Sequence, residues 1–244
     1  MTSNIDLVLK ELFGLQRLGI KVGLEHTEEL LDNIGNPHSH LKFIHIAGTN
    51  GKGSTCAILN KILIEHGMVV GLYTSPHLVR FNERIQVNNE KISDADIALF
   101  MNHHINQIKN IQTTFFETTT AMAFDYFNNK SIDIAIIETG LGGRLDSTNV
   151  ISPTVCGISS VSLDHMDILG DTIQKIAKEK AGIIKDNIPI VTFDQNKFVI
   201  DIIKKTAAQK NAVLTIIKNS DIELLSFDNQ GTLFKYKNYT INLP

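Results

Sequence analysis

The stretch KFIHIAGTNGKGSTCAILNKILIEHG, residues 42–67, decides the fold. Its apolar start at 42–47 predicts a buried strand, GTNGKGST at 48–55 predicts a tight turn, and residues 53–66 predict a helix. Strand, glycine-rich turn and helix in this order are the setting of a phosphate-binding loop. There the backbone N–H groups converge on an anion at the positive end of the helix.

The spacing of this loop departs from the usual pattern G-x-x-x-x-G-K-[ST]. Gly53 separates Lys52 from Ser54, and the leading glycine, Gly48, stands too close to Gly51. The turn still offers a lysine charge for the β- and γ-phosphates and a hydroxyl that can reach a phosphate or its Mg²⁺. The loop is therefore predicted to bind a nucleotide in spite of its spacing.

Outward from this loop, short apolar runs alternate with helical stretches. Further strands are predicted at 69–73, 132–138, 154–160 and 189–193, and further helices at 94–110, 117–129, 172–185 and 196–210. This alternation predicts an α/β fold with a mostly parallel sheet flanked by helices. The segments AVLTII, IELLSF, TLFKYK and YTINL are then predicted to form β-hairpins near the C-terminus.

One ATP-binding domain is expected over residues 1–244. It divides into a helical lead-in at 1–40, the P-loop core at 41–195, and a helix with β-hairpins at 196–244. Within the lead-in, apolar residues at helical spacing predict a first helix, and a second is predicted from Thr27 to Ile34 with Thr27 as its N-cap.

Composition narrows the class of protein. The net charge of −3 argues against a nucleic-acid partner or an anionic membrane surface. No apolar run reaches the roughly 20 residues of a membrane span, and the first residues do not resemble a signal peptide. Cys56 and Cys156 are expected as buried free thiols in a reducing compartment. A cytoplasmic, monomeric protein is predicted.

Polar residues follow three of the predicted strands where ligands bind open α/β sheets. Glu138 closes IDIAIIE in the position of a Walker-B carboxylate, Ser75 follows the second strand, and His165 follows the fourth. Taken singly, they could equally be a solvated carboxylate, an ordinary turn serine and a surface histidine. The nearby GLGG is not a dinucleotide fingerprint, because Leu145 occupies the place of the last glycine.

Six motifs occur in order: GLEHTEELLDNIGNP, HIAGTNGKGST, GLYTSPHLVRFNERIQVN, FFETTTAMAF, IIETGLGGRLDSTN and SLDHMDILGDTIQKIAKEKAGIIK. Together they resemble the folylpolyglutamate synthase and dihydrofolate synthase family of the Mur ligase superfamily. In this family, a glycine after the loop lysine is normal. The resemblance implies that ATP phosphorylates the carboxylate of a folate or of dihydropteroate. The amine of L-glutamate then displaces phosphate to form an amide.

The resemblance also implies roles for individual residues. ATP phosphates are assigned to Asn50, Gly51, Lys52, Gly53 and Ser54. One or two Mg²⁺ ions are assigned to Ser75, Glu138 and His165. The implied catalytic residues are Lys52, Lys180 and His165, with Lys180 matching a lysine that is carbamylated in the family and supports a second Mg²⁺.

The folate pocket is assigned, again by resemblance, to Thr114, Phe116 and Asp146, with Arg84 in a flexible loop that shapes it. Phe116 would stack on the pterin, and Asp146 would accept hydrogen bonds from its amine groups. Ser147 stands where alanine is commoner in the family. Family members carry a second, C-terminal domain that helps to bind nucleotide and glutamate. It is expected to be absent here, so that this chain has little or no ligase turnover.

Other functions stay open at this point. A Mur ligase of peptidoglycan synthesis would share the phosphate loop and the pattern of metal ligands, although LVRFNERI and FFETTTAM favour the folate branch. A P-loop GTPase or kinase is disfavoured because the sequence lacks an N-K-x-D signature and a strict Walker A motif. A non-catalytic nucleotide-binding module is the third alternative. Whether the whole enzyme makes dihydrofolate, extends folates or does both stays undecided.

Overall fold

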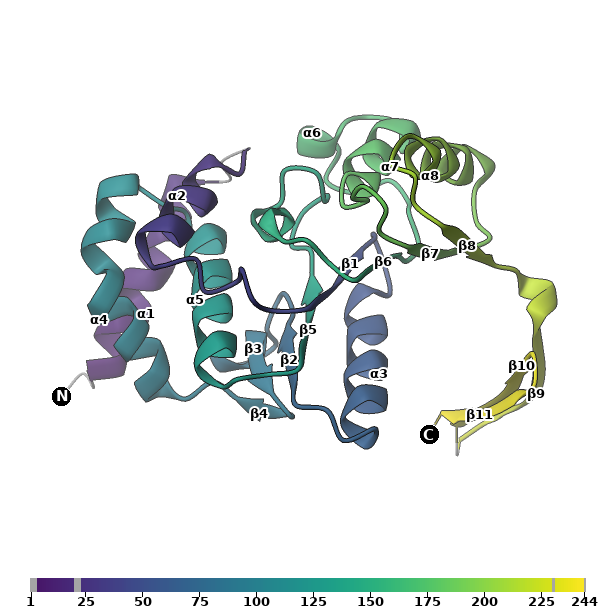
Figure 1. Ribbon diagram of the computed structural model, residues 1–244, viewed down its shortest axis with the longest axis horizontal. Helices are drawn as coiled ribbons and strands as arrows, with labels where there is room; N and C mark the ends of the chain where they lie inside the picture. Colours follow the sequence, from purple (N-terminus) through teal and green to yellow (C-terminus); the bar gives the residue numbers. More distant parts are fainter. Residues whose placement is uncertain (1–3, 20–22, 230, 244) are drawn as a thin grey trace.

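A computed structural model describes residues 4–19, 23–229 and 231–243 of the chain. Its main sheet has eight strands (Figure 1). Their spatial order is β4 (Glu90–Lys91), β3 (Ile85–Val87), β2 (Val70–Tyr73), β5 (Ile134–Glu138), β1 (Phe43–Ala47), β6 (Val155–Ile158), β7 (Ile190–Phe193) and β8 (Leu214–Ile217). In that spatial order, neighbouring strands from β2 to β8 pair in parallel, whereas the pairs β2–β3 and β3–β4 are antiparallel. The predicted fold class is confirmed.

Helices cover both faces of the sheet. On one face lie α1 (Asn4–Gly14), α2 (Glu25–Asn33), α4 (Asp94–Ile111), α5 (Phe115–Asn129), α7 (Ile173–Ala181) and α8 (Lys197–Gln209). On the other, α3 (Lys52–Glu65) packs against β1, β2 and β5 (Figure 1). Side chains of β1 alternate between the two faces of the sheet. Phe43 and Ala47 lie on the face of α5 and α7, and Ile44 and Ile46 lie on the face of α3.

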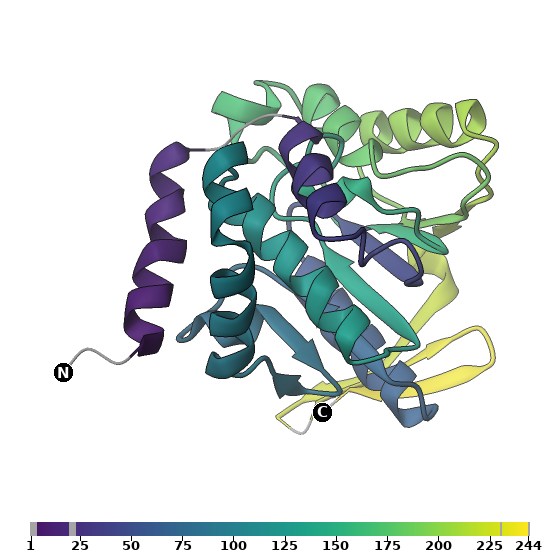
Figure 2. The same ribbon diagram turned by 60° about the vertical axis from the view of Figure 1, so that its left-hand side comes forward.

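The last three strands form a separate antiparallel sheet, β9 (Ile222–Asp228), β10 (Gly231–Tyr236) and β11 (Tyr239–Leu243) (Figure 2). Hairpins were predicted there and are confirmed. The prediction for AVLTII was wrong, because Leu214–Ile217 is β8 and pairs in parallel with β7. The helix α8 between β7 and β8 supplies the crossover that parallel pairing requires, so the strand extends the main sheet.

Two local features also differ from the sequence predictions. The hairpin of β3 and β4 was not predicted; its turn residues Asn88 and Asn89 both have positive φ, of 49° and 68°, as a tight two-residue hairpin requires. Thr27 is not an N-cap. The helix α2 starts two residues earlier, at Glu25, and Thr27 is buried inside it. Within the described residues, no helix is long and apolar enough to span a membrane.

Candidate active site

The loop between β1 and α3 leaves the start of the helix open. Gly48 and Gly51 have φ angles of 151° and 80°, which favour glycine. A Cβ atom on Gly48 would lie 1.9 Å from the Ser159 hydroxyl oxygen. Asn50, Gly53 and Ser54 are exposed to solvent, so the first turn of α3 can receive an anion.

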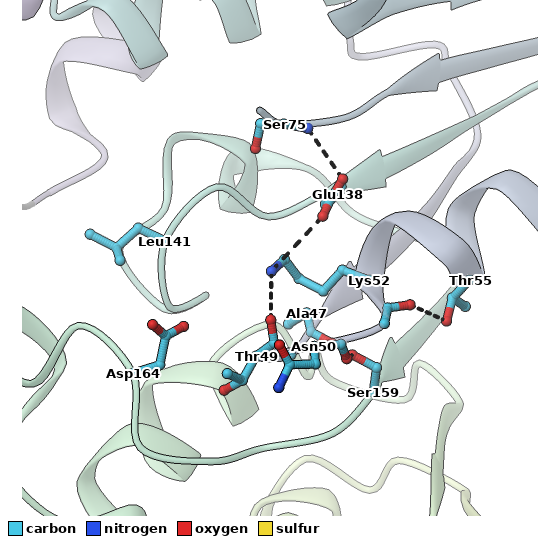
Figure 3. A network of polar contacts seen from close by, with 12 residues as sticks. Ala47, Thr49, Asn50, Lys52, Thr55, Ser75, Glu138, Leu141, Ser159 and Asp164 are labelled. Carbon is cyan, nitrogen blue, oxygen red and sulfur yellow. Dashed lines mark hydrogen bonds and ion pairs between the residues drawn. The ribbon is translucent and has the colours of Figure 1, made fainter. Parts of the chain in front are cut away.

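The segment after β6 holds the loop in place (Figure 3). The Thr49 N–H donates to the Ser160 carbonyl at 2.6 Å, and the Ser159 hydroxyl donates to the Asn50 carbonyl at 2.8 Å. The Ser160 hydroxyl donates to the same carbonyl at 3.0 Å. Sequence analysis did not single out these two serines, although their position directly after a strand beside the loop was a usable signal. They prearrange the loop before any ligand binds.

Lys52, Ser75 and Glu138 come together beside the loop (Figure 3). The Lys52 ammonium donates to the Thr49 carbonyl at 3.3 Å and lies 3.9 Å from Glu138 Oε1. The other carboxylate oxygen of Glu138 accepts from the Ser75 N–H at 3.2 Å. Burial raises the pKa of Glu138, although the Ser75 N–H and the Lys52 charge both act to lower it. Three residues predicted from separate motifs thus form one polar cluster.

Among the described contacts, none joins His165 to that cluster. It precedes the short helix α6 (Met166–Leu169) with φ of 46°, and its side chain is 55% exposed. Its Nε2 atom is 3.5 Å from Asp164 Oδ1. Over the described ranges, no group of three His, Cys, Asp or Glu side chains could hold a metal ion. A metal-binding role for His165 stays a prediction.

Lys180 is buried beneath the loop. Only 2% of this residue is exposed, and its ammonium donates to the Gly48 carbonyl at 2.8 Å. Burial, with Lys52 adding a second positive charge nearby, lowers the pKa of Lys180 to about 8. The side chain therefore ties α7 to the first residue of the phosphate loop.

A pocket of about 120 Å³ opens on the loop that follows β5, the strand that ends at Glu138. Its described wall includes Thr114, Phe116, Leu141, Arg144, Asp146 and Leu169. Three of the four residues predicted for a substrate pocket thus surround one cavity. Phe116 is 39% exposed and offers a ring face, whereas Asp146 is buried and accepts a hydrogen bond from the Leu141 N–H at 2.7 Å. Phosphate loop, carboxylate and pocket share one edge of the sheet.

Residues 46–244 match the Mur ligase middle domain family. The chain belongs to that family. It is 45% identical over 206 residues to the dihydrofolate synthase/folylpolyglutamate synthase of Bacillus subtilis (strain 168), covering 82% of this chain and 48% of that protein. The predicted resemblance is confirmed. The chain spans about half the length of such curated relatives.

Solved structures agree with this assignment. A folylpolyglutamate synthase from Thermotoga maritima superposes with a TM-score of 0.86 at 38% identity, covering 97% of this chain and 56% of that one. A structure described as an FPGS–AMPPCP–folate complex gives a TM-score of 0.88 at 33% identity, covering 98% of this chain and 61% of that one.

In this Mur ligase middle domain, Arg84 does not line the pocket wall directly. It ends a short 3₁₀ helix, Phe81–Arg84, and is 5% exposed, in contrast to the flexible loop expected from the sequence. Its Nε donates to His77 Nδ1 at 2.8 Å, and its guanidinium lies 5.2 and 5.7 Å from the ring centres of Phe115 and Phe116. Arg84 supports the pocket from behind Phe116, and its proposed contact with folate stays a prediction.

The GLGG segment packs against the end of α7. The Arg144 N–H donates to the Glu179 carbonyl at 2.7 Å, and the Arg144 guanidinium lies 2.9 Å from the Glu179 carboxylate. A Cβ atom on Gly143 would lie 2.9 Å from the Glu179 carbonyl oxygen, and one on Gly182 would lie 2.3 Å from Arg144 Cβ. These glycines serve close packing of a loop on a helix, which explains a motif that is not a dinucleotide fingerprint.

Proposed function

We propose that this chain is the ATP-binding part of a ligase that joins L-glutamate to the carboxylate of a folate, of dihydropteroate, or of both. The observation that carries the proposal is the pairing of Lys52 with Glu138, 3.9 Å apart, beside an open helix start and a pocket on the same sheet edge. The names of its relatives, a dihydrofolate synthase/folylpolyglutamate synthase and an FPGS–AMPPCP–folate complex, support the same substrates.

The chemistry requires activation of a carboxylate, which is a poor electrophile. Transfer of the γ-phosphoryl group of ATP to the carboxylate forms an acyl phosphate, and attack by the glutamate amine releases phosphate and leaves an amide. Charge moves on to the phosphate oxygens during transfer. Lys52 and the backbone of the exposed residues Asn50, Gly51, Gly53 and Ser54 are proposed to stabilise that charge.

Glu138 and Ser75 suit a Mg²⁺ ion that accompanies ATP. The ion takes oxygen ligands, few of them from protein, and the Glu138 carboxylate lies buried beside Ser75 at the mouth of the phosphate loop. When bound, Mg²⁺ supplies positive charge to the phosphate oxygens. His165 is proposed as a further ligand, and Lys180 as the carbamylated residue that supports a second ion.

Thr114, Phe116 and Asp146 are proposed to hold the pterin end of the substrate. Their support is that all three line one pocket on the loop that follows β5. Phe116 has an exposed ring face for stacking, and Arg84 behind it fixes the ring through a cation–π contact.

Binding and turnover measured together test the proposed function. Mg²⁺–ATP and dihydropteroate or folate are each expected to bind the 244-residue chain in calorimetric titrations, with little or no amide formed on addition of L-glutamate. Nucleotide binding without binding of either pterin compound would favour a non-catalytic nucleotide-binding module. Preference for a nucleotide-linked peptidoglycan precursor would favour the other Mur ligase branch. Efficient amide formation would refute the expected lack of turnover.

Carbamylation of Lys180 is expected to depend on pH. Only the neutral amine forms a bond to CO₂, losing a proton, and the pKa of about 8 makes a neutral amine accessible near neutral pH. With ¹³C-labelled bicarbonate, one carbamate carbon signal should appear and grow as pH rises through about 8. The Lys180→Arg variant should lose it. The Lys178→Arg variant, which changes an exposed lysine of the same helix, should keep it. A spectrum without a carbamate signal would refute the modification.

A further inference from the structure

A row of three buried side chains leads from the middle of β1 to the pocket. His45 is fully buried on β1, and its Nε2 atom lies 2.9 Å from the Thr148 hydroxyl. That hydroxyl makes a short hydrogen bond to Asp146 Oδ1, and the Thr148 N–H donates to the same oxygen at 3.0 Å. Asp146 lines the pocket. None of the proposed chemistry uses His45 or Thr148.

The direction of these hydrogen bonds follows from the chemistry of the groups. An ionised carboxylate only accepts, so the Thr148 hydroxyl donates its single proton to Asp146. Its oxygen must then accept from His45, which places the imidazole proton on Nε2. Nδ1 is left as an unprotonated nitrogen, and it is buried without a hydrogen-bond partner among the residues that the structure describes. The absence of a described partner at Nδ1 is compatible with the tautomer that the bond at Nε2 requires.

The imidazole of His45 stays neutral over the ordinary range of pH. Complete burial lowers the pKa of His45 to about 3, and the nearby Lys185 charge acts in the same direction. Burial raises the pKa of Asp146, whereas the donors Thr148 and Leu141 stabilise its charged form. Each donor to Asp146 therefore matters for keeping this buried group an acceptor.

We infer that His45 is a positioning residue for the substrate pocket. Its imidazole holds the Thr148 hydroxyl in place to donate to Asp146, and that bond fixes the carboxylate that lines the pocket. Without the imidazole donor, the Thr148 oxygen loses the contact that holds its hydroxyl in place, and the hydrogen bond to Asp146 loses the polarisation that the imidazole provides. The carboxylate then loses its short hydrogen bond for part of the time. The identity of the ligand as a pterin rests on the proposed function. The chain of hydrogen bonds from His45 through Thr148 to Asp146, called the relay below, rests on the geometry.

Two substitutions at one position test the inference. His45→Phe keeps an aromatic ring but removes the donor, and His45→Gln can place an amide N–H near the position of Nε2. The phenylalanine variant is expected to weaken binding of dihydropteroate or folate about fivefold to tenfold, the effect of one hydrogen bond, with little change in the Mg²⁺–ATP dissociation constant. The glutamine variant should restore most of the loss. Equal weakening of both ligands, or no recovery with glutamine, would overturn the inference.

A spectroscopic measurement separates this inference from the proposed function. Nitrogen-15 NMR of the imidazole is expected to show a neutral ring protonated on Nε2 between about pH 6 and pH 8. The Nε2 signal should shift in Thr148→Val and stay in place in Thr148→Ser, which keeps the hydroxyl. A protonated ring or the other tautomer would refute the relay. If the wild-type chain binds no pterin while these signals appear as expected, the proposed function fails and the relay stands. Should His45→Phe not fold, the two Thr148 variants supply the same binding comparison.

Discussion

Replacing Lys52 with methionine is expected to weaken binding of Mg²⁺–ATP about 100-fold, the usual effect of removing one charged donor from a prearranged anion site. The Lys52 ammonium stands at the start of α3 and contacts the Thr49 carbonyl and the Glu138 carboxylate, at 3.3 and 3.9 Å. Methionine keeps the length and the apolar stem but leaves Glu138 facing the phosphates without its neighbouring positive charge.

Titration calorimetry with Mg²⁺–ATP measures this effect directly. Lys61→Met is the matched control, because Lys61 lies further along the same helix, is largely exposed and pairs with Glu65. Removing the Lys61 charge should change the dissociation constant of Mg²⁺–ATP less than about twofold, since exposed ion pairs contribute little. Thermal unfolding of both variants verifies that they fold. A Lys52→Met variant that binds as tightly as Lys61→Met would show that the lysine does not contact the nucleotide.

Gly182→Ala is expected to lower the free energy of unfolding by about 2–3 kcal/mol, in the range measured for overpacked interiors. The new Cβ would lie 2.3 Å from Arg144 Cβ and 2.5 Å from Arg144 Cα. Neither atom moves when a side chain rotates, so the backbone of the GLGG loop itself has to shift. The φ and ψ angles of Gly182, −65° and −10°, suit alanine, so the cost arises from the clash alone.

Urea unfolding followed by circular dichroism measures this difference. Gly14→Ala provides the control, because Gly14 has similar angles, φ −57° and ψ −29°, and a Cβ there would meet nothing within 4 Å. It should leave stability unchanged or raise it by a few tenths of a kcal/mol, up to about 1 kcal/mol, because alanine favours a helix over glycine. Equal free energies of unfolding for the two variants would contradict the prediction, because they would mean that the GLGG loop shifts without destabilising the fold.

Much of the fold was predictable because burial leaves a periodic trace in the sequence. The runs that became β1, β2, β5, β6 and β7 are short and apolar, and α-helices separate all of them except β5 and β6, which are joined by a loop with a short 3₁₀ helix. The β3–β4 hairpin was missed because its strands are too short to show alternation. The segment of β8 was misassigned because an apolar run alone does not say whether its partner is parallel or antiparallel.

Site residues that belong to a sequence motif were predictable. Contacts between residues far apart in the sequence were not. Lys52, Ser75 and Glu138 were predicted from three separate motifs and lie together. The contact between Lys180 and the Gly48 carbonyl joins residues far apart in the sequence, and no local pattern encodes it. The same holds for His45 and Thr148, which meet only because β1 and the segment after β5 pack against each other.

The loop after β5 connects the two halves of the proposed reaction. It begins next to Glu138, where the phosphate donor is proposed to lie, and ends at Asp146 in the pocket of the acceptor. Its backbone is braced on α7 through Arg144 and Glu179. The separation between the nucleotide site and the pterin end of the pocket is therefore set by one short loop of the chain. Changes in its length would alter alignment of the substrates before they altered the affinity for either one.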